Sequence, residues 1–163
     1  MSAADSLREL RELVFFQGLS DAYLQQISAV AERVCYAEGK LLFREGDLAL
    51  DAHLVLRGNV SLEICAPGVG CRRILTIGRG EIVGWSPLLG QERFTATART
   101  LVATELLKMR GSQLLAMCEL DPRFGYEFTQ RVAMTLVKRL NATRMQLLDV
   151  YGSAMPHESD NSL

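Results

Sequence analysis

Closely spaced glycines constrain the middle of this chain more than any other feature. Between residues 34 and 109, short apolar runs end in turn sequences such as Glu45-Gly46-Asp47 and Arg57-Gly58-Asn59. Glycine and its polar neighbours break helices and favour tight turns, and no alternation of strands with helices indicates a parallel sheet. Many short strands separated by such turns predict an antiparallel sandwich or barrel. We expect strands at residues 41–43, 53–56, 60–65, 72–77, 94–98 and 103–108.

Residues 4–33, before this region, have a helical pattern. Leu7, Leu10 and Leu13 recur at helical spacing, and Gly18 marks a break. Ser20 then has the character of an N-cap, because its side-chain oxygen can accept from the first unpaired backbone amides of a helix. We therefore expect a second helix over residues 22–32.

The region after the strands is again helical. Ser112 is predicted to cap a short helix that ends near Glu119, and Asp121-Pro122 gives an N-cap followed by proline at the first helical position. The helix expected over residues 122–150 has a length of roughly 43 Å. Its apolar residues form a heptad seam made of Ala133, Leu136, Leu140, Thr143, Leu147 and Val150.

A second apolar face of this helix, formed by Val137, Leu148 and Tyr151, is expected to pack on the barrel. A seam in addition to a packing face predicts a homodimer through the helix. The alternative is a long helix buried against its own barrel. We expect one domain over residues 1–151 and a disordered polar tail over residues 152–163.

Charge and hydropathy exclude several classes of function. The net charge of −1 gives no global basic field of the kind that attracts nucleic acid, so direct DNA binding is not expected. No apolar run reaches the roughly 18 residues of a membrane span, and the N-terminus lacks the apolar core of a signal peptide. The sequence therefore predicts a cytoplasmic protein that does not contact the membrane.

Cysteine and histidine give no evidence for a metal or catalytic site. The four cysteines include no CxxC pair and are expected to be reduced and mostly buried, although a disulfide between Cys65 and Cys71 across a hairpin stays open. His53 and His157, the only histidines, have no cluster of ligand-type neighbours in the sequence. With no nucleophile–base constellation either, the protein is expected to be non-enzymatic.

Several stretches, in the same order, resemble the cyclic-nucleotide-binding domain family. They are Phe43-Arg44-Glu45-Gly46-Asp47, the segment Leu54–Val60, Gly80-Glu81-Ile82-Val83-Gly84 and Ala96-Thr97, and the similarity spans residues 14–151. The resemblance implies an α+β fold, mainly β, in which an antiparallel jelly-roll barrel follows N-terminal helices and precedes a long dimerisation helix.

The pattern is most similar to the sensor half of Crp/Fnr-type regulators, whose dimer-helix segment that touches adenine resembles Arg139–Thr143. The residues after Tyr151 are too few for the helix-turn-helix that follows in those regulators. We therefore expect the output to go to an unknown protein partner.

The segment Gly80–Thr100 resembles the family's phosphate-binding cassette, with its usual contact residues replaced. The family holds the nucleotide with a Gly-Glu pair, the backbone amides of a short helix and an arginine. Here Gly84 matches the glycine, but Trp85 stands at the glutamate position and cannot accept a hydrogen bond through its indole N–H. Pro87 removes one amide, and Phe94 stands at the arginine position, one residue after Arg93.

The cassette still predicts a short helix over residues 85–89, with Ser86 as its N-cap and Pro87 at its first position. Three interpretations stay open: weak binding of cAMP or cGMP, binding of another small anionic effector, or a pocket filled by Trp85 and Phe94. The first two describe a regulatory sensor, and the third a structural or interaction dimer. The candidate ligand contacts are Gly84, Trp85, Ser86, Leu88, Leu89, Arg93, Phe94, Thr95, Arg139 and Thr143.

Overall fold

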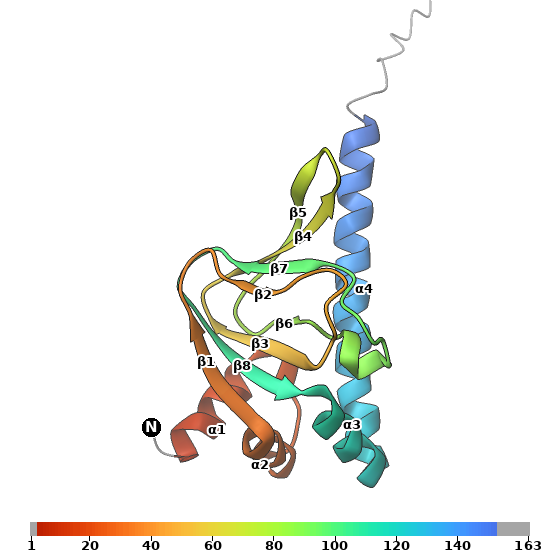
Figure 1. Ribbon diagram of the computed structural model, residues 1–163. Coiled ribbons are helices and arrows are strands. Elements are labelled where there is room, and N and C mark those ends of the chain that lie inside the picture. The colour runs from red at the N-terminus through yellow and green to blue at the C-terminus, as the bar shows by residue number, and fades with distance from the viewer. Residues whose placement is uncertain (1–2, 153–163) are drawn as a thin grey trace, which may run out of the picture.

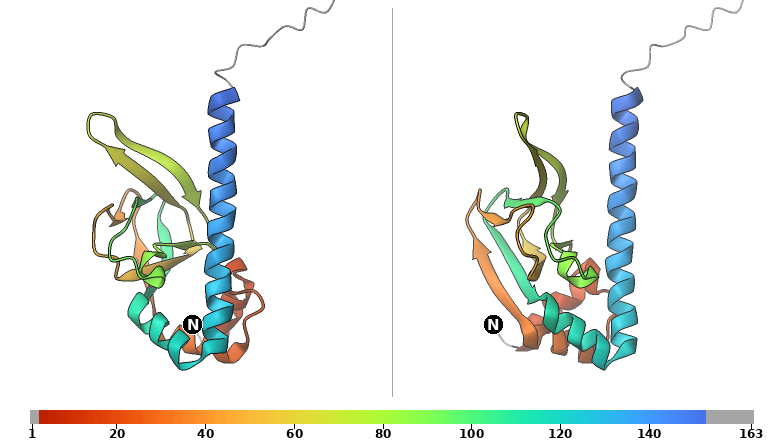
Figure 2. Two further views of the ribbon diagram at one scale, coloured as in Figure 1. Left: turned by 90° about the vertical axis from the view of Figure 1, so that its right-hand side faces the viewer. Right: turned by 45° about the vertical axis from the view of Figure 1, so that its right-hand side comes forward.

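The computed structural model describes residues 3–152 and confirms the expected mainly β, α+β fold. Within those residues, two four-stranded sheets face each other as a jelly roll, with helices at one end and a long helix alongside (Figure 1). The strand orders are β1-β8-β3-β6 and β2-β7-β4-β5, and the pairings within both sheets are antiparallel. The long helix and the β4–β5 hairpin extend beyond the rest of the body (Figure 2).

The elements follow one another in the order that the glycine pattern and the helical patterns predict. The helical segments are α1 (Ala3–Glu12), η1 (Val14–Phe16), α2 (Asp21–Val30), η2 (Ser86–Leu89), α3 (Gly111–Leu120) and α4 (Pro122–Gly152). The strands are β1 (Ala31–Tyr36), β2 (Leu41–Phe43), β3 (Asp51–Arg57), β4 (Val60–Ala66), β5 (Gly70–Ile77), β6 (Ile82–Val83), β7 (Thr97–Thr100) and β8 (Thr104–Arg110).

Several elements differ from those expected. Helix α2 ends at Val30, two residues before the predicted end, because Ala31 starts the strand β1 and pairs with Met109 of β8. The strand expected from residue 94 starts at Thr97, and Arg93 forms only an isolated bridge with Leu48. The strands β1 and β6, which the sequence did not reveal, pair with β8 and β3, respectively.

Strand β3 separates the two parts of the core. Successive residues of a strand point to opposite faces of the sheet, and here both faces are covered. Leu54 and Leu56, with no exposed surface, pack in the cluster that the helices build, whereas Val55 packs inside the barrel with Leu106. The continuous apolar run of this strand is explained by burial on both faces.

The N-cap of α4 is confirmed and that of α3 is not. The Oδ1 atom of Asp121 accepts from the backbone amides of Arg123 and Phe124, at 3.1 and 3.2 Å. Helix α3 begins two residues earlier than expected, with Arg110 in place of Ser112 at its N-cap and no side-chain cap, so Ser112 lies inside the helix. The predicted N-cap of α2 is confirmed, because the Ser20 hydroxyl accepts from the amide of Tyr23.

Helix α4 contacts the body through its first half. Phe124, Phe128 and Val132 are buried among the N-terminal helices and α3, and Phe124 meets the ring of Tyr23 edge-on at 5.1 Å. The helix continues to Gly152, which was expected to start the disordered tail. Residues 153–163, the remainder of that expected tail, lie outside the described residues.

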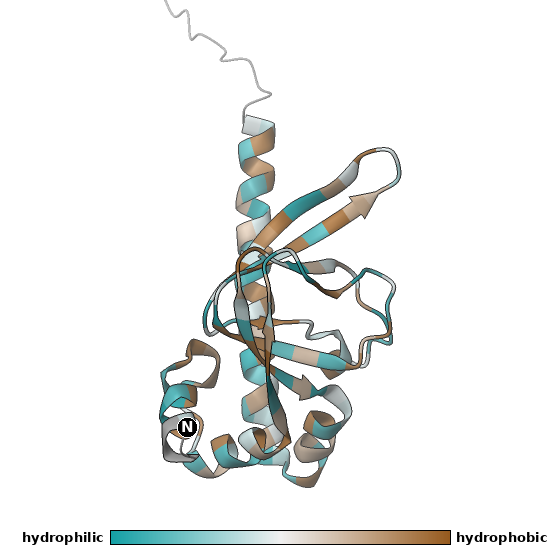
Figure 3. Ribbon diagram, turned by 60° about the vertical axis from the view of Figure 1, so that its left-hand side comes forward, coloured by the Kyte–Doolittle hydropathy of each residue, from teal (hydrophilic) through white to brown (hydrophobic). Residues whose placement is uncertain are grey.

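The packing expected for the second apolar face of α4 is wrong. Val137, Leu148 and Tyr151 are 49%, 63% and 63% exposed. At about 100° per residue they lie on the side of α4 opposite Phe124 and Phe128, together with Leu140 and Leu147, which are also exposed. Figure 3 shows apolar bands that recur along this part of the helix. We call this surface the outer face of α4; it comprises Ala133, Val137, Leu140, Leu147, Leu148 and Tyr151.

Two glycines allow the cassette, α3 and α4 to pack closely against one another. A Cβ added at Gly111, the first residue of α3, would lie 2.6 Å from the Cβ atom of Pro87 in η2. A Cβ added at Gly125 in α4 would lie 2.8 Å from the carbonyl oxygen of Cys118 in α3. Real Cβ atoms do not approach other heavy atoms so closely, so both contacts require glycine.

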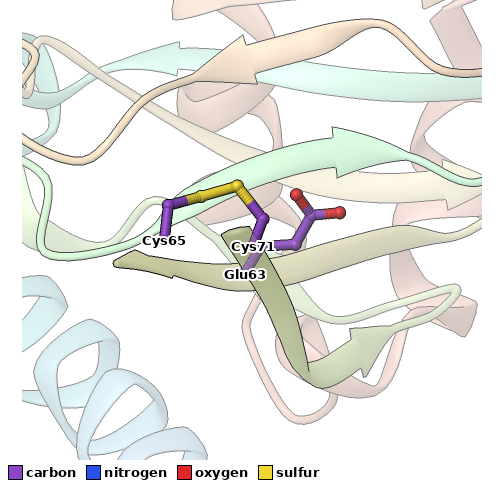
Figure 4. Close-up of side chains that lie close together, drawn as sticks. All are labelled: Glu63, Cys65 and Cys71. Carbon is purple, nitrogen blue, oxygen red and sulfur yellow. A yellow bond between two sulfur atoms is a disulfide. The ribbon is translucent and has the colours of Figure 1, made fainter. Parts of the chain in front are cut away.

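Cys65 and Cys71 form a disulfide across the β4–β5 hairpin, so the expectation of four reduced thiols is wrong (Figure 4). The two residues lie opposite each other in the strand register, which brings their side chains together on one face. Glu63 lies beside them, but bonded sulfur atoms offer no thiolate to a metal. The remaining cysteines are also less buried than expected, because Cys35 is exposed and Cys118 is half-buried.

The buried imidazole of His53 predicts a loss of stability in acid. Burial in β3 lowers the pKa of His53 to about 4, from about 6.5 in an unfolded chain. Between these pH values the unfolded chain takes up a proton that the folded protein refuses, so the free energy of unfolding falls as the pH falls. The expected loss is on the order of 3 kcal/mol. Urea unfolding at a series of pH values should show a shallower pH slope for His53→Asn, and an unchanged slope would contradict this origin.

Among residues 3–152, no helix combines the length and the apolar character that crossing a bilayer requires.

Candidate functional site

The cassette residues converge on a very small cavity. Gly84, Trp85, Ser86, Phe94 and Thr95 line a space of about 30 Å³, which Arg139 of α4 closes from the other side. We call it the cassette cavity. Six of the ten predicted contact residues are therefore brought together here. Its volume is about that of one water molecule in the liquid, far below the 300–1,000 Å³ typical of ligand pockets.

Two stacked aromatic rings fill the space beside the cassette. The rings of Phe43 in β2 and Phe94 lie 3.7 Å apart and nearly parallel, and both side chains are buried. Phe43 lines the same cavity as Phe94. Trp85, which the sequence suggested as a second filler, is half-buried and packs against the helical part of the core. Phe43 therefore performs the role that was expected of Trp85.

The short helix of the cassette is present, with a different cap. Residues 86–89 form the 3-10 turn η2, whose N-cap is Trp85 and not Ser86. Ser86 is the first residue of the turn and is buried. Pro87 has no amide to offer, and the amide of Leu88 already donates to the carbonyl of Trp85 at 2.9 Å. Few backbone donors of this turn remain for an anion.

Arg139 is the cation that α4 directs at the cassette. Its Nη2 atom donates to the backbone carbonyl of Ile82 in β6, whereas Nε and Nη1 are buried with no hydrogen-bond partner among the described residues. Burial lowers the pKa of Arg139 to about 10, an effect that the carboxylate of Glu81 partly opposes. The side chain therefore remains charged at neutral pH, and two of its donors lack the acceptors that buried polar groups normally have.

Four predicted contact residues lie elsewhere. Leu88 and Leu89 line a separate cavity of about 50 Å³ between η2, α3 and α4. The side chain of Arg93 donates to the carbonyl of Gly46 at 2.7 Å and is not among the residues that line the cassette cavity. Thr143 is exposed, and its hydroxyl donates to the carbonyl of Arg139, one turn earlier in α4.

A larger cavity, which the sequence did not reveal, lies on the other side of Arg139. It has a volume of about 310 Å³ and runs between η1, the strand β5 and the inner side of α4. Apolar walls come from Val14, Phe15, Leu75, Ile77 and Ala142, and polar groups from Thr76, Glu81, Thr135, Lys138 and Arg139. We call this space the helix cavity.

A sequence signal for part of the helix cavity exists. Thr135, Lys138, Arg139 and Ala142 recur at the spacing of three and four residues that places side chains on one side of a helix. Arg139 was among the predicted ligand contacts, whereas Lys138 was not. The opposite walls come from η1 and β5, more than fifty residues away along the chain.

Comparisons with known proteins agree with this geometry. The family model for the cyclic nucleotide-binding domain matches residues 33–121. The chain is 29% identical over 132 residues to the cyclic AMP receptor protein of Thermus thermophilus. The aligned region covers 81% of this chain and 59% of that protein. It spans 29% of a second curated relative.

Solved structures give the same result. A protein of Geobacter metallireducens assigned to cyclic nucleotide binding superimposes with a TM-score of 0.74 at 27% identity, covering 83% of this chain and 98% of that one. The catabolite activator protein of Thermus thermophilus superimposes with a TM-score of 0.68 at 28% identity, covering 85% of this chain and 62% of that one.

Proposed function

Because the chain belongs to the cyclic nucleotide-binding domain family, we propose that it is a non-enzymatic regulatory sensor domain with a degenerate cassette. Such a domain binds cAMP or cGMP weakly, or binds another small anionic effector, and passes the signal to a protein partner. A protein output fits the net charge of −1, which provides no global field for nucleic acid.

One observation carries the sensor function: the two unpaired donors of Arg139. A buried donor without an acceptor costs about 1–3 kcal/mol, so an anion that accepts from Nε or from Nη1 recovers part of this free energy on binding. The same side chain holds the carbonyl of Ile82, two residues before Gly84. An anion bound to Arg139 therefore lies where β6, the strand that leads into the cassette, contacts α4.

The outer face of α4 supports a homodimer as the signalling unit. Exposed apolar side chains repeat along it at heptad spacing, and a second copy of the same helix buries them in a coiled coil. Leu140 and Leu147 belong to the seam that the sequence predicts and are 52% and 57% exposed in the single chain. The inner side of α4, with Arg139, remains directed at the barrel in such a dimer.

A second candidate function is a structural or interaction dimer whose nucleotide pocket no longer works. The stack of Phe43 on Phe94 favours it, because these buried rings leave only about 30 Å³ in the cassette cavity. The dimer surface would then be the function, and no small molecule would be needed.

Titration calorimetry with cAMP and cGMP tests the sensor function. For the unmodified protein we expect a dissociation constant of about 1 mM, or about −4 kcal/mol, since a nucleotide must first displace the aromatic stack. The Arg139→Met variant should lose this binding, and Trp85→Glu should strengthen it by restoring an acceptor for the ribose hydroxyl.

Arg123→Met is the matched control, because Arg123 lies on the same helix with its side chain 83% exposed. Binding in the low micromolar range would contradict a degenerate cassette. Binding that Arg139→Met leaves unchanged would contradict the role of Arg139. No response from the unmodified protein or from Trp85→Glu would favour the structural dimer.

A further inference from the structure

We propose that the helix cavity is a binding site for a small amphipathic anion, with a compact apolar body and one carboxylate-type head group. This inference rests on the proposed sensor function but places the effector beside the cassette, on the opposite side of Arg139.

Volume separates the two cavities that share Arg139. The cassette cavity holds about 30 Å³, whereas the helix cavity holds about 310 Å³. Pockets that bind small molecules start at roughly 300 Å³. A molecule of that size therefore fits the helix cavity without displacing the stacked rings of Phe43 and Phe94.

The charges of the helix cavity favour an anionic head group. Lys138 and Arg139 both line the cavity, and the Nε and Nη1 atoms of Arg139 have no acceptor among the described residues. A carboxylate can accept charge-assisted hydrogen bonds from a guanidinium and from an ammonium group, so Arg139 and Lys138 can share one head group. Glu81 is the acidic residue in the lining, and its Oε2 atom already accepts from the amide of Gly78 at 2.8 Å. The head group is therefore expected on the α4 side of the cavity, away from Glu81.

The walls of the cavity favour an apolar body. Phe15 and Ile77 are buried, Leu75 is half-buried, and Val14 is 57% exposed although it is apolar. Each methylene group transferred from water to such a surface contributes about 0.8 kcal/mol. A fully polar anion such as inorganic phosphate gains no binding free energy from these apolar walls. The ligand is therefore expected to combine an apolar body with an anionic head group.

An occupant of this cavity bridges elements that otherwise touch sparsely. Beyond Arg139, α4 approaches β5 through a hydrogen bond from Gln146 to the carbonyl of Ile74, at 3.3 Å. A molecule held by Arg139, Leu75 and Ala142 adds contacts between the helix and the strand. Binding is thus expected to fix the position of α4, whose outer face forms the proposed dimer.

Octanoate is the probe, and 1-octanol is its uncharged counterpart. Two variants distinguish the cavities, each adding a phenyl ring at an exposed residue: Ala142→Phe narrows the helix cavity and Thr95→Phe narrows the cassette cavity. In titration calorimetry we expect octanoate to bind the full chain with a dissociation constant of about 100 µM. Octanol should bind at least 10-fold more weakly.

Ala142→Phe and Arg139→Met should each weaken octanoate binding at least 10-fold, whereas Thr95→Phe and Arg123→Met should change it less than 2-fold. Lys138→Met, at a more exposed residue of the lining, provides a second charge variant in case Arg139→Met does not fold by circular dichroism.

Three outcomes would overturn the site: no octanoate binding by the unmodified protein, equal binding of octanol, or no effect of Ala142→Phe. If Thr95→Phe abolishes binding and Ala142→Phe does not, the effector enters the cassette. The sensor function then stands and this site fails.

Discussion

Replacing Phe124 with alanine is expected to lower the free energy of unfolding by about 3–5 kcal/mol, the usual cost of removing a buried phenyl ring. Phe124 has no exposed surface, meets Tyr23 edge-on at 5.1 Å and stacks with Phe128 at 5.5 Å. The ring joins the base of α4 to α2. Its loss leaves a cavity between α4 and α2.

Urea unfolding followed by circular dichroism, at one protein concentration, measures this effect. Leu120→Ala is the control, because Leu120 is also apolar and near α4 but is 87% exposed. Exposed substitutions of this kind change stability by about 0.5 kcal/mol or less. A Phe124→Ala variant that matches Leu120→Ala would show that α4 is not anchored through this ring.

Placing glutamates at Leu140 and Leu147 together is expected to convert a dimer into a monomer. In the proposed dimer each leucine buries its exposed half against the partner helix, which stabilises the pair by about 1 kcal/mol per side chain. The introduced carboxylates would have to be buried opposite each other, which adds a further penalty. The dissociation constant should rise by about 1,000-fold or more.

Sedimentation equilibrium reports this change directly. The unmodified protein should have twice the 18.1 kDa mass of the chain, and the double variant the mass of one chain. Leu120→Glu, which makes the same change at an exposed leucine of α3, should remain dimeric. An unmodified protein that sediments as a single chain at high micromolar concentration would refute the dimer through α4.

The order of the elements was predictable because turn residues and helix caps are local signals. Asp121 and Ser20 cap helices as expected, since a cap needs only residues within one turn. The strand β1 was missed altogether, because Ala31 and Glu32 also fit a helix and only the pairing with β8 reveals the strand. Which side of α4 packs against the body was predicted only in part, for a similar reason. Apolar residues occur on several of its sides, and the side that packs inward is chosen by Phe124 and Phe128.

The candidate site was predictable only where its residues are consecutive. The cassette residues around Trp85 do meet Arg139, as the resemblance implied. Phe43 was not recognised as the ring that stacks on Phe94, because about fifty residues separate them in the sequence. The helix cavity was out of reach for the same reason, since η1, β5 and α4 meet there only in the folded chain.

The glycine contacts at Gly111 and Gly125 have a mechanical consequence. A flexible side chain at an interface can change its rotamer and so absorb a small displacement of the neighbouring element. A glycine has no side chain that could adjust in this way. The cassette turn η2 meets α3 at Gly111, and α3 meets α4 at Gly125. We therefore expect η2, α3 and α4 to move together. A shift at the cassette is therefore expected to reach α4 through these two contacts, and a bulkier residue at either glycine is expected to weaken this transmission.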